Sequence, residues 1–138
     1  MTHERSHELI GRGESRLLII DVQEKLMPAI PVRESLIRNC RKLIEADLIE
    51  CVLGLGPNLF YNSPMEACVV ICRTQKPKAR RGKILFINAV NEVTRERAQS
   101  FLTDEHIQRV VRAYRDFQDE PGFTRVATLE EIRSKDGN

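Results

Sequence analysis

Positive charge is concentrated in a short connection between two apolar segments. Lys78, Arg80 and Arg81 lie in this connection, and Lys76 and Lys83 flank them. Cations grouped in this way can contact nucleic-acid phosphates, and each contact adds affinity that depends on salt but carries no sequence information. The same charges also suit a solvated turn that discourages pairing at a sheet edge. Both interpretations stay open, with Lys78, Arg80 and Arg81 as the candidate phosphate contacts.

The cysteine and histidine side chains lack the spacing of a metal site. Structural zinc sites need cysteines and histidines at short, defined intervals. The cysteines form no CxxC pair, and His3, His7 and His106 are not grouped with them. Cys68 and Cys72 lie within an apolar run, where cysteine behaves as a small hydrophobic residue. We therefore expect no metal and a reduced, cytoplasmic protein.

The composition is that of one soluble globular domain. The chain has 138 residues, is 41% hydrophobic and 30% charged, and carries a net charge of +2, which neither requires nor excludes a nucleic-acid partner. No apolar run approaches the ~18 residues of a membrane helix. The N-terminus has no apolar signal segment, so we expect no membrane association.

Apolar patterning places the first half of an α/β fold. After a loose N-terminus over 1–15, the continuous apolar run 17–20 predicts a strand buried on both faces, as in a parallel sheet. Residues 34–46 form one apolar helical stripe that includes Ile37. The next strand is expected over 49–55.

Two further apolar runs, 67–72 and 83–88, predict strands. The connection between them is too short for a parallel crossover of about a dozen residues, so we expect a hairpin. Thr103 is a good N-cap for a helix whose buried stripe begins at Ile107, and a short helix is expected over 129–132. The fold class is therefore α/β with a late antiparallel hairpin, and its free sheet edges need covering.

Several blocks in order carry a family resemblance over about 41–135. One of them is Gly54-Leu55-Gly56-Pro57-Asn58-Leu59-Phe60-Tyr61, and the others are residues 41–50, 67–72, 81–89, 122–126 and 130–132. This succession resembles the modification (methyltransferase) subunit of type I restriction–modification systems. The resemblance implies part of a Rossmann-like methyltransferase sheet. It also implies DNA and the specificity and restriction subunits as partners.

That family transfers a methyl group from S-adenosylmethionine to the exocyclic amine of adenine, and the base must leave the duplex stack to be reached. A Gly-rich loop holds the cofactor, and an Asn-Pro-Pro-Phe loop orients the amine. Neither motif occurs in this sequence, since Asp21-Val22-Gln23 follows the strand at 17–20. We therefore expect the chain to be a fragment that is inactive alone and binds no cofactor by itself.

The resemblance also assigns a role to an aromatic pair. In related adenine methyltransferases an aromatic side chain stacks on the displaced base, and Phe60 matches that position with Tyr61 beside it. Such stacking contributes about 1–3 kcal/mol. Packing against the sheet edge is the structural alternative, and we expect packing in this chain because no pocket faces Phe60.

A second resemblance covers roughly 3–44. Residues 15–30 are similar to the opening strand of isochorismatase-like cysteine hydrolases, where Asp21 would match the aspartate that activates the nucleophile. The lysine and cysteine of that family have no counterpart, so a strand-end carboxylate is the alternative. The expected organisation is 1–15 loose, 16–44 isochorismatase-like and 45–138 methylase-like, fused near 41–45. An inactive hydrolase remnant and a small nucleic-acid-binding module are the other functional hypotheses.

Overall fold

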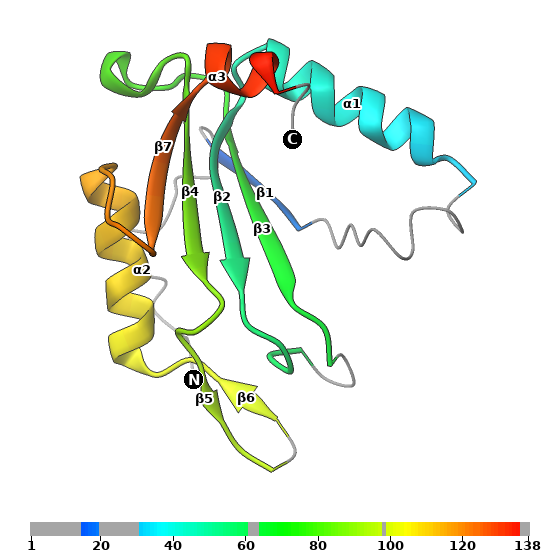
Figure 1. Cartoon of the computed structure of the whole chain (residues 1–138). Helices are drawn as coiled ribbons and strands as arrows, with labels where there is room; N and C mark the ends of the chain where they lie inside the picture. Colours follow the sequence, from blue (N-terminus) through cyan, green and yellow to red (C-terminus); the bar gives the residue numbers. More distant parts are fainter. Residues whose placement is uncertain (1–14, 20–30, 61–63, 98, 136–138) are drawn as a thin grey trace, which may run out of the picture.

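A computed structural model describes residues 15–19, 31–60, 64–97 and 99–135 of the chain. They form a five-stranded mixed sheet with helices on both faces and a separate two-stranded ribbon (Figure 1). The elements in chain order are β1 (Ser15–Ile19), α1 (Arg33–Glu45), β2 (Ile49–Leu55), β3 (Ala67–Arg73), the 3-10 turn η2 (Lys78–Arg80), β4 (Lys83–Ala89), β5 (Thr94–Arg95), β6 (Ser100–Phe101), α2 (Asp104–Asp116), β7 (Thr124–Thr128) and α3 (Leu129–Ser134).

The strand order in the sheet is β1-β3-β2-β4-β7. The central strand β2 is antiparallel to β3 and parallel to β4. The outer strands β1 and β7 are antiparallel to β3 and β4. The carboxyl ends of β2 and β4 therefore lie at the same edge of the sheet, next to the ribbon of β5 and β6 (Figure 1).

Alternating side chains divide the core between the two faces of the sheet. Leu85 and Ile87 lie in the cluster covered by α2, whereas Ile84 lies in a second cluster with residues of α1 and α3. This alternation is the period-2 geometry of a strand. Two layers of helix thus cover a single mixed sheet.

Most elements confirm the sequence-based expectations. The helix predicted over 34–46 is α1, and the strands predicted over 49–55, 67–72 and 83–88 are β2, β3 and β4. The N-cap of α2 is Thr103, whose Oγ1 accepts a hydrogen bond from the His106 backbone N–H at 3.3 Å. His106 Nδ1 accepts one from the Thr103 N–H at 3.2 Å, so the two residues form a reciprocal capping box.

Two predictions of strand pairing are wrong. The strand at the N-terminus, β1, pairs antiparallel with β3 and has no parallel neighbour among the described strands. The expected hairpin of β3 with β4 does not form, because β2 lies between them. The late antiparallel pair is instead β4 with β7. The apolar pattern of the sequence does not predict β7, which is short and begins directly after the turn at Gly122 and Phe123.

Two residues of the predicted buried stripes are exposed. Ile37 is 46% exposed and Ile107 is 43% exposed. The first half of α1 runs outward past the sheet (Figure 1), so only its last turn, with Leu43 and Ile44, packs on the core. A helical stripe is buried only where the sheet extends beneath it. Among the described residues, no helix has the length and apolar character needed to span a bilayer.

Candidate functional site

The loop after β2, residues 56–60, lies at the carboxyl ends of the parallel strands β2 and β4. This loop is called the lip below. Ligands of open α/β sheets commonly bind at this edge. Gly56 is buried, and a Cβ on it would lie 2.5 Å from the Val90 carbonyl oxygen. The next turn uses Asn58 in the left-handed region at φ 61°, and the Asn58 carbonyl accepts a hydrogen bond from the Ser100 N–H at 2.9 Å. These contacts fasten the lip to the segments after β4 and at β6.

The lip presents an aromatic side chain to solvent. Phe60 is 45% exposed, and Phe101 of the neighbouring ribbon is 42% exposed. A half-exposed ring has a free face on which another ring can stack. Tyr61 lies outside the described residues. The aromatic residue predicted at Phe60 is thus accessible to solvent at the edge of the sheet where ligands of open α/β sheets commonly bind.

The three candidate phosphate contacts, Lys78, Arg80 and Arg81, lie in the connection between β3 and β4. Arg80 makes internal contacts, whereas Lys78 and Arg81 are exposed. Arg80 Nη2 donates to the carbonyls of Tyr114 and Arg115 at 3.2 and 2.9 Å. Its guanidinium also lies 4.6 Å from the centre of the Phe117 ring. A cation at these carbonyls satisfies the end of α2 and complements its dipole. Arg80 therefore joins the connection to α2.

Lys76 is also committed to internal contacts. Its ammonium donates to Asp47 Oδ1 at 2.6 Å and to the Lys83 carbonyl at 2.8 Å. Asp47 Oδ2 accepts a further hydrogen bond from the Gly82 N–H at 2.8 Å. One carboxylate therefore holds both ends of the connection.

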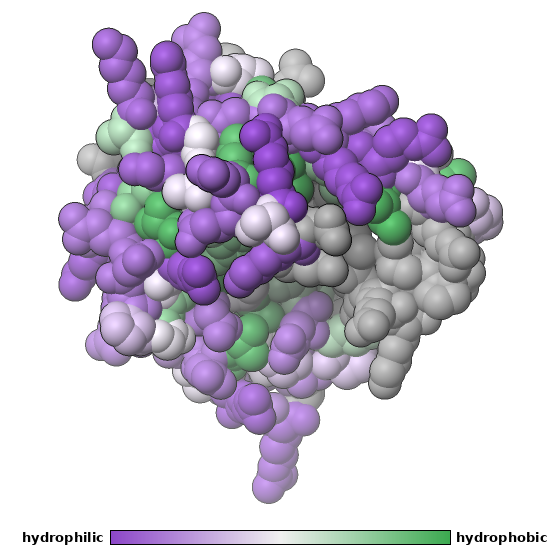
Figure 2. All heavy atoms as spheres, turned by 45° about the horizontal axis from the view of Figure 1, so that its top comes forward, coloured by the Kyte–Doolittle hydropathy of each residue, from purple (hydrophilic) through white to green (hydrophobic). Residues whose placement is uncertain are grey.

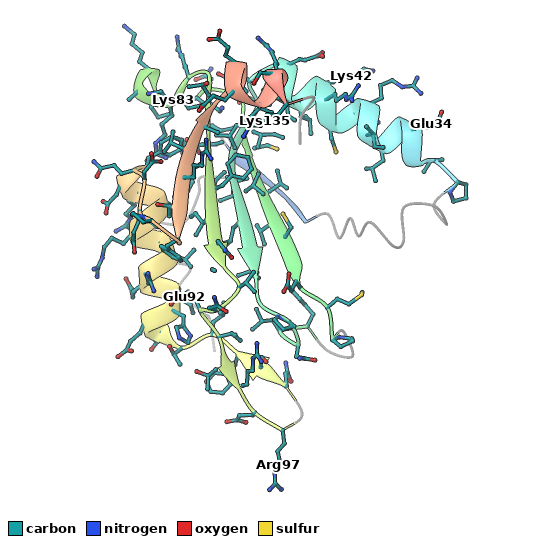
Figure 3. All side chains as sticks on the ribbon, viewed as in Figure 1. Glu34, Lys42, Lys83, Glu92, Arg97 and Lys135 are labelled. Carbon is teal, nitrogen blue, oxygen red and sulfur yellow. The ribbon has the colours of Figure 1, made fainter. Side chains whose placement is uncertain are left out.

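Lys78 and Arg81 are exposed. Arg81 Nε donates to the Lys76 carbonyl at 3.3 Å. Lys83 lies at the same end of the molecule as Lys42 and Lys135 (Figure 3). Hydrophilic side chains cover most of the surface when this end is turned forward (Figure 2).

A bulge in β2 creates a buried acidic group that sequence analysis missed. Ile49 and Cys51 pair with adjacent residues of β3, so Glu50 has no partner in that ladder. A bulge re-aims the side chain of the extra residue. The Glu50 side chain is fully buried, and Tyr114 Oη donates to its Oε2 at 2.5 Å.

Two arginines neutralise this carboxylate. Arg80 Nη1 lies 3.3 Å from Glu50 Oε1, and Arg73 Nε lies 3.6 Å from Oε2. Burial, and then the hydrogen bond to Glu50, raise the pKa of Tyr114 to about 12. Since Glu50 has no access to solvent, it cannot take a proton from a substrate. An acidic residue within an apolar strand was the sequence signal for this cluster.

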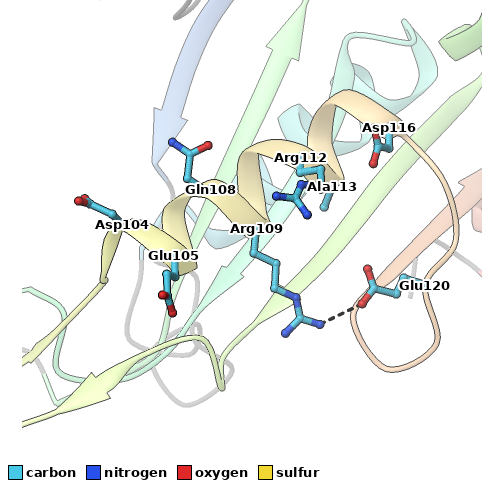
Figure 4. Close-up of a pocket in the computed structure, with 8 residues that line it drawn as sticks. All are labelled: Asp104, Glu105, Gln108, Arg109, Arg112, Ala113, Asp116 and Glu120. Atoms are coloured by element: carbon cyan, nitrogen blue, oxygen red, sulfur yellow. Dashed lines mark hydrogen bonds and ion pairs between the residues drawn. The ribbon is translucent and has the colours of Figure 1, made fainter.

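The groove on the outer side of α2 has a volume of about 510 Å³. Most of its lining is charged (Figure 4). Arg109 is held by ion pairs to Glu92 at 2.5 Å and Glu120 at 2.9 Å, and its guanidinium stacks 4.1 Å from the centre of the Phe123 ring. The groove is therefore a charged helix surface whose Arg109 is already paired within the chain.

Cys51, Cys68 and Cys72 have raised pKa values, and the described cysteines do not form part of a metal-binding cluster. Burial raises the pKa of the Cys51 thiol to about 12, with a further contribution from Glu50. Burial also raises the pKa of Cys68 and Cys72. A raised pKa suppresses the thiolate, which is the reactive form. Within the part of the chain that the structure describes, no group of three or more metal-binding side chains occurs.

The described residues do not fit S-adenosylmethionine. A cofactor loop needs glycines so that a backbone can approach the ligand. Among the described residues, the glycine that directly follows a strand is Gly56, and it faces the chain's own carbonyl at Val90 instead of open space. Asp21, which the sequence placed as a hydrolase aspartate, lies outside the described residues.

A known protein family matches the part of the chain that contains the lip, Glu50 and the connection between β3 and β4. Residues 31–138 match the family model described as N-6 DNA Methylase. The match begins within the segment 16–44. The comparisons give no support to the resemblance of the N-terminal segment to isochorismatase-like hydrolases.

Individual relatives agree with the family match. The chain is 42% identical over 101 residues to the type I restriction enzyme MjaVIII methylase subunit of Methanocaldococcus jannaschii, which covers 71% of this chain and 18% of the relative. It is 31% identical over 103 residues to the HindI methylase subunit of Haemophilus influenzae, covering 70% of this chain and 23% of that protein.

A solved structure shares the fold. The crystal structure of the type I restriction-modification system methyltransferase subunit from Streptococcus thermophilus superimposes with a TM-score of 0.67 at 31% identity, over 77% of this chain and 21% of that one. The chain thus spans about a fifth of the length of the relatives it matches. On the strength of the match over residues 31–138, the chain belongs to the N-6 DNA methylase family.

Proposed function

We propose that this chain supplies the base-facing lip of an adenine-specific DNA methyltransferase subunit of a type I restriction–modification system. Methyl transfer requires the remainder of such a subunit. The observation that carries the proposal is the 42% identity to an archaeal methylase subunit over 101 residues, within the family match. The exposed Phe60 at the carboxyl edge of the parallel strands supports it.

Phe60 stacks on the displaced adenine in the assembled enzyme. Its ring is half-exposed, and the left-handed turn at Asn58 and the close approach at Gly56 fix the lip that carries it. A base that leaves the duplex loses its stacking partners, and an aromatic side chain restores about 1–3 kcal/mol per base. Tyr61 is the adjacent candidate for the same role.

S-adenosylmethionine supplies the methyl group in this proposal. The described residues of this chain do not fit the cofactor, because the glycine at the lip is packed against the chain itself. The residues of this chain therefore bind and orient the target base, whereas the rest of a complete subunit holds the methyl donor.

Lys78 and Arg81 are the proposed phosphate contacts. Both are exposed on the connection between β3 and β4, whereas Arg80 is occupied by Glu50 and by the end of α2. Phosphate contacts would position DNA without reading its sequence. Specificity would then come from a separate specificity subunit, with a restriction subunit as the third partner.

Two measurements on the chain alone test whether the methyl donor is bound by the rest of a complete subunit and not by this chain. Calorimetric titration with S-adenosylmethionine should give no binding heat, and incubation with radiolabelled cofactor and DNA should give no labelled DNA. Binding or labelling by the chain alone would overturn the proposal.

A chimera tests the role of the lip. The corresponding segment of the archaeal relative is replaced by residues 31–138 of this chain. The chimera should methylate DNA, and Phe60→Ala should lower that rate by roughly 5- to 150-fold, since stacking contributes about 1–3 kcal/mol. Phe101→Ala is the matched control, because Phe101 is similarly exposed on the ribbon. Equal losses in the two variants would contradict a specific role for Phe60.

A further inference from the structure

The edge strand β1 lies outside the part of the chain that matches the family. The family match begins at residue 31, whereas β1 spans Ser15–Ile19. It is the neighbour of β3 at one end of the sheet. A segment that the family match does not include therefore covers the outer edge of β3, defined here as the side of β3 that faces away from β2.

The pairing of β1 with β3 is continuous. It is antiparallel and runs from Ser15 opposite Arg73 to Ile19 opposite Val69. The other side of β3 is already paired with β2. Without β1, the outward backbone groups of β3 would have no partner in the sheet. An open edge of this kind is a template for an added strand.

The side chains of β3 define what kind of strand fits this edge. Val69 and Ile71 pack against the cluster beneath α2, whereas Val70 and Cys72 pack against the cluster on the opposite face. A strand added beside β3 therefore extends two apolar layers at once. It must be apolar at successive positions, as strands buried on both faces are.

We propose that the outer edge of β3 is a binding site for an extended, apolar peptide strand, and that β1 occupies this site from within the same chain. The sequence of β1 ends in Leu17, Leu18 and Ile19, three successive apolar residues with no polar residue between them. This run meets the requirement set by the two clusters. When β1 is disabled, the edge accepts a peptide of the same chemistry from another molecule.

The test uses the full-length chain with Leu17→Pro and Leu18→Pro together. Successive residues of an antiparallel ladder alternate between bonded and non-bonded pairs, so one of two adjacent prolines removes a ladder donor in either phase. The matched control is His7→Pro, which changes a residue upstream of β1. The probe is a fluorescein-labelled synthetic peptide with the sequence of residues 14–20.

Fluorescence anisotropy should show peptide binding to the double-proline variant. The parent and His7→Pro should bind at least about tenfold more weakly, because a tethered strand competes at high effective concentration. A peptide with Leu18→Asp should bind the variant more weakly than the parent peptide. Hydrogen exchange of the β3 amides should be faster in the variant and slow again when the peptide is added.

Several results would overturn the proposal. One is a folded double-proline variant with unchanged β3 exchange and no peptide binding. Another is self-association of that variant which the peptide does not reverse, whereas self-association that the peptide reverses supports an acceptor edge. The parent provides a test that needs no variant, since fast exchange of the outward β3 amides in the parent would show that β1 does not fill the edge.

Discussion

The change Tyr114→Phe tests the buried cluster that joins α2 to the sheet. It removes one hydroxyl and keeps the ring that packs against the core cluster and lies 5.2 Å from the Arg80 guanidinium. The lost group is the donor to Glu50, whose side chain is fully buried. The substitution therefore isolates one hydrogen bond to a buried carboxylate.

The expected loss follows from the geometry that remains. After the change, the partners that Glu50 keeps among the described residues are Arg80 at 3.3 Å and the more distant Arg73 at 3.6 Å. A hydrogen bond to a charged group contributes about 1.5–3 kcal/mol, so we expect a decrease of about 2 kcal/mol in the free energy of unfolding. For a chain of this size that corresponds to a fall in Tm of roughly 6–8 °C.

Urea and thermal unfolding of the full-length chain, followed by circular dichroism, measure this loss. Glu50→Gln and the double variant complete a double-mutant cycle, in which we expect a coupling energy of about 1–2 kcal/mol. A loss below about 0.5 kcal/mol for Tyr114→Phe would be typical of an unconnected surface site. That result, or a coupling energy near zero, would refute the assignment of the cluster as the link between α2 and the sheet.

Three further predictions concern the close approach at Gly56, the pKa of Tyr114 and the burial of Cys51. Gly56→Ala should destabilise the chain by roughly 1–3 kcal/mol because its Cβ would meet a backbone carbonyl at 2.5 Å. Gly54→Ala, whose nearest contact is at 3.8 Å, should cost less in the same urea titration, and equal losses would contradict the close approach at the lip. Because the pKa of Tyr114 is raised from 10.0 to about 12, the unfolded chain ionises first. The stabilisation is therefore present below about pH 10 and is lost as the pH rises towards about 12. Ultraviolet titration of a Tyr61→Phe chain checks this shift, and a midpoint near pH 10 in the folded chain would disprove it. Cys51, whose pKa burial raises to about 12, should react with a thiol reagent only after unfolding, unlike the partly exposed Cys40, Cys68 and Cys72. Peptide mapping locates the modified thiols, and rapid modification of Cys51 itself in the folded chain would show that this side chain is accessible.

Local signals in the sequence were sufficient to place most elements. The apolar period of α1 and the N-cap at Thr103 of α2 act within one or two turns, and both helices form where these signals predict. The apolar runs of β2, β3 and β4 also become strands. The ordered family blocks were a further local property, and the match over 31–138 confirms the family they indicated.

Strand partners could not be read in the same way. An apolar run specifies a buried strand but not the strand beside it, so β3 was predicted next to β4 although β2 separates them. Exposure has the same limit, since Ile37 follows the helical stripe but lies on the half of α1 that runs past the sheet.

The sequence by itself determined most of the element types, the family and Phe60 as a candidate aromatic residue. Only the tertiary structure decided that Arg80 pairs with the buried Glu50 and that Lys76 pairs with the partly exposed Asp47. A bulge moves Glu50 onto the face of α2. The physical reason is that a charge stays in water unless folding supplies a partner, and these partners lie about 30 residues away along the chain. Pairing at such separations depends on sheet order, which no local pattern encodes.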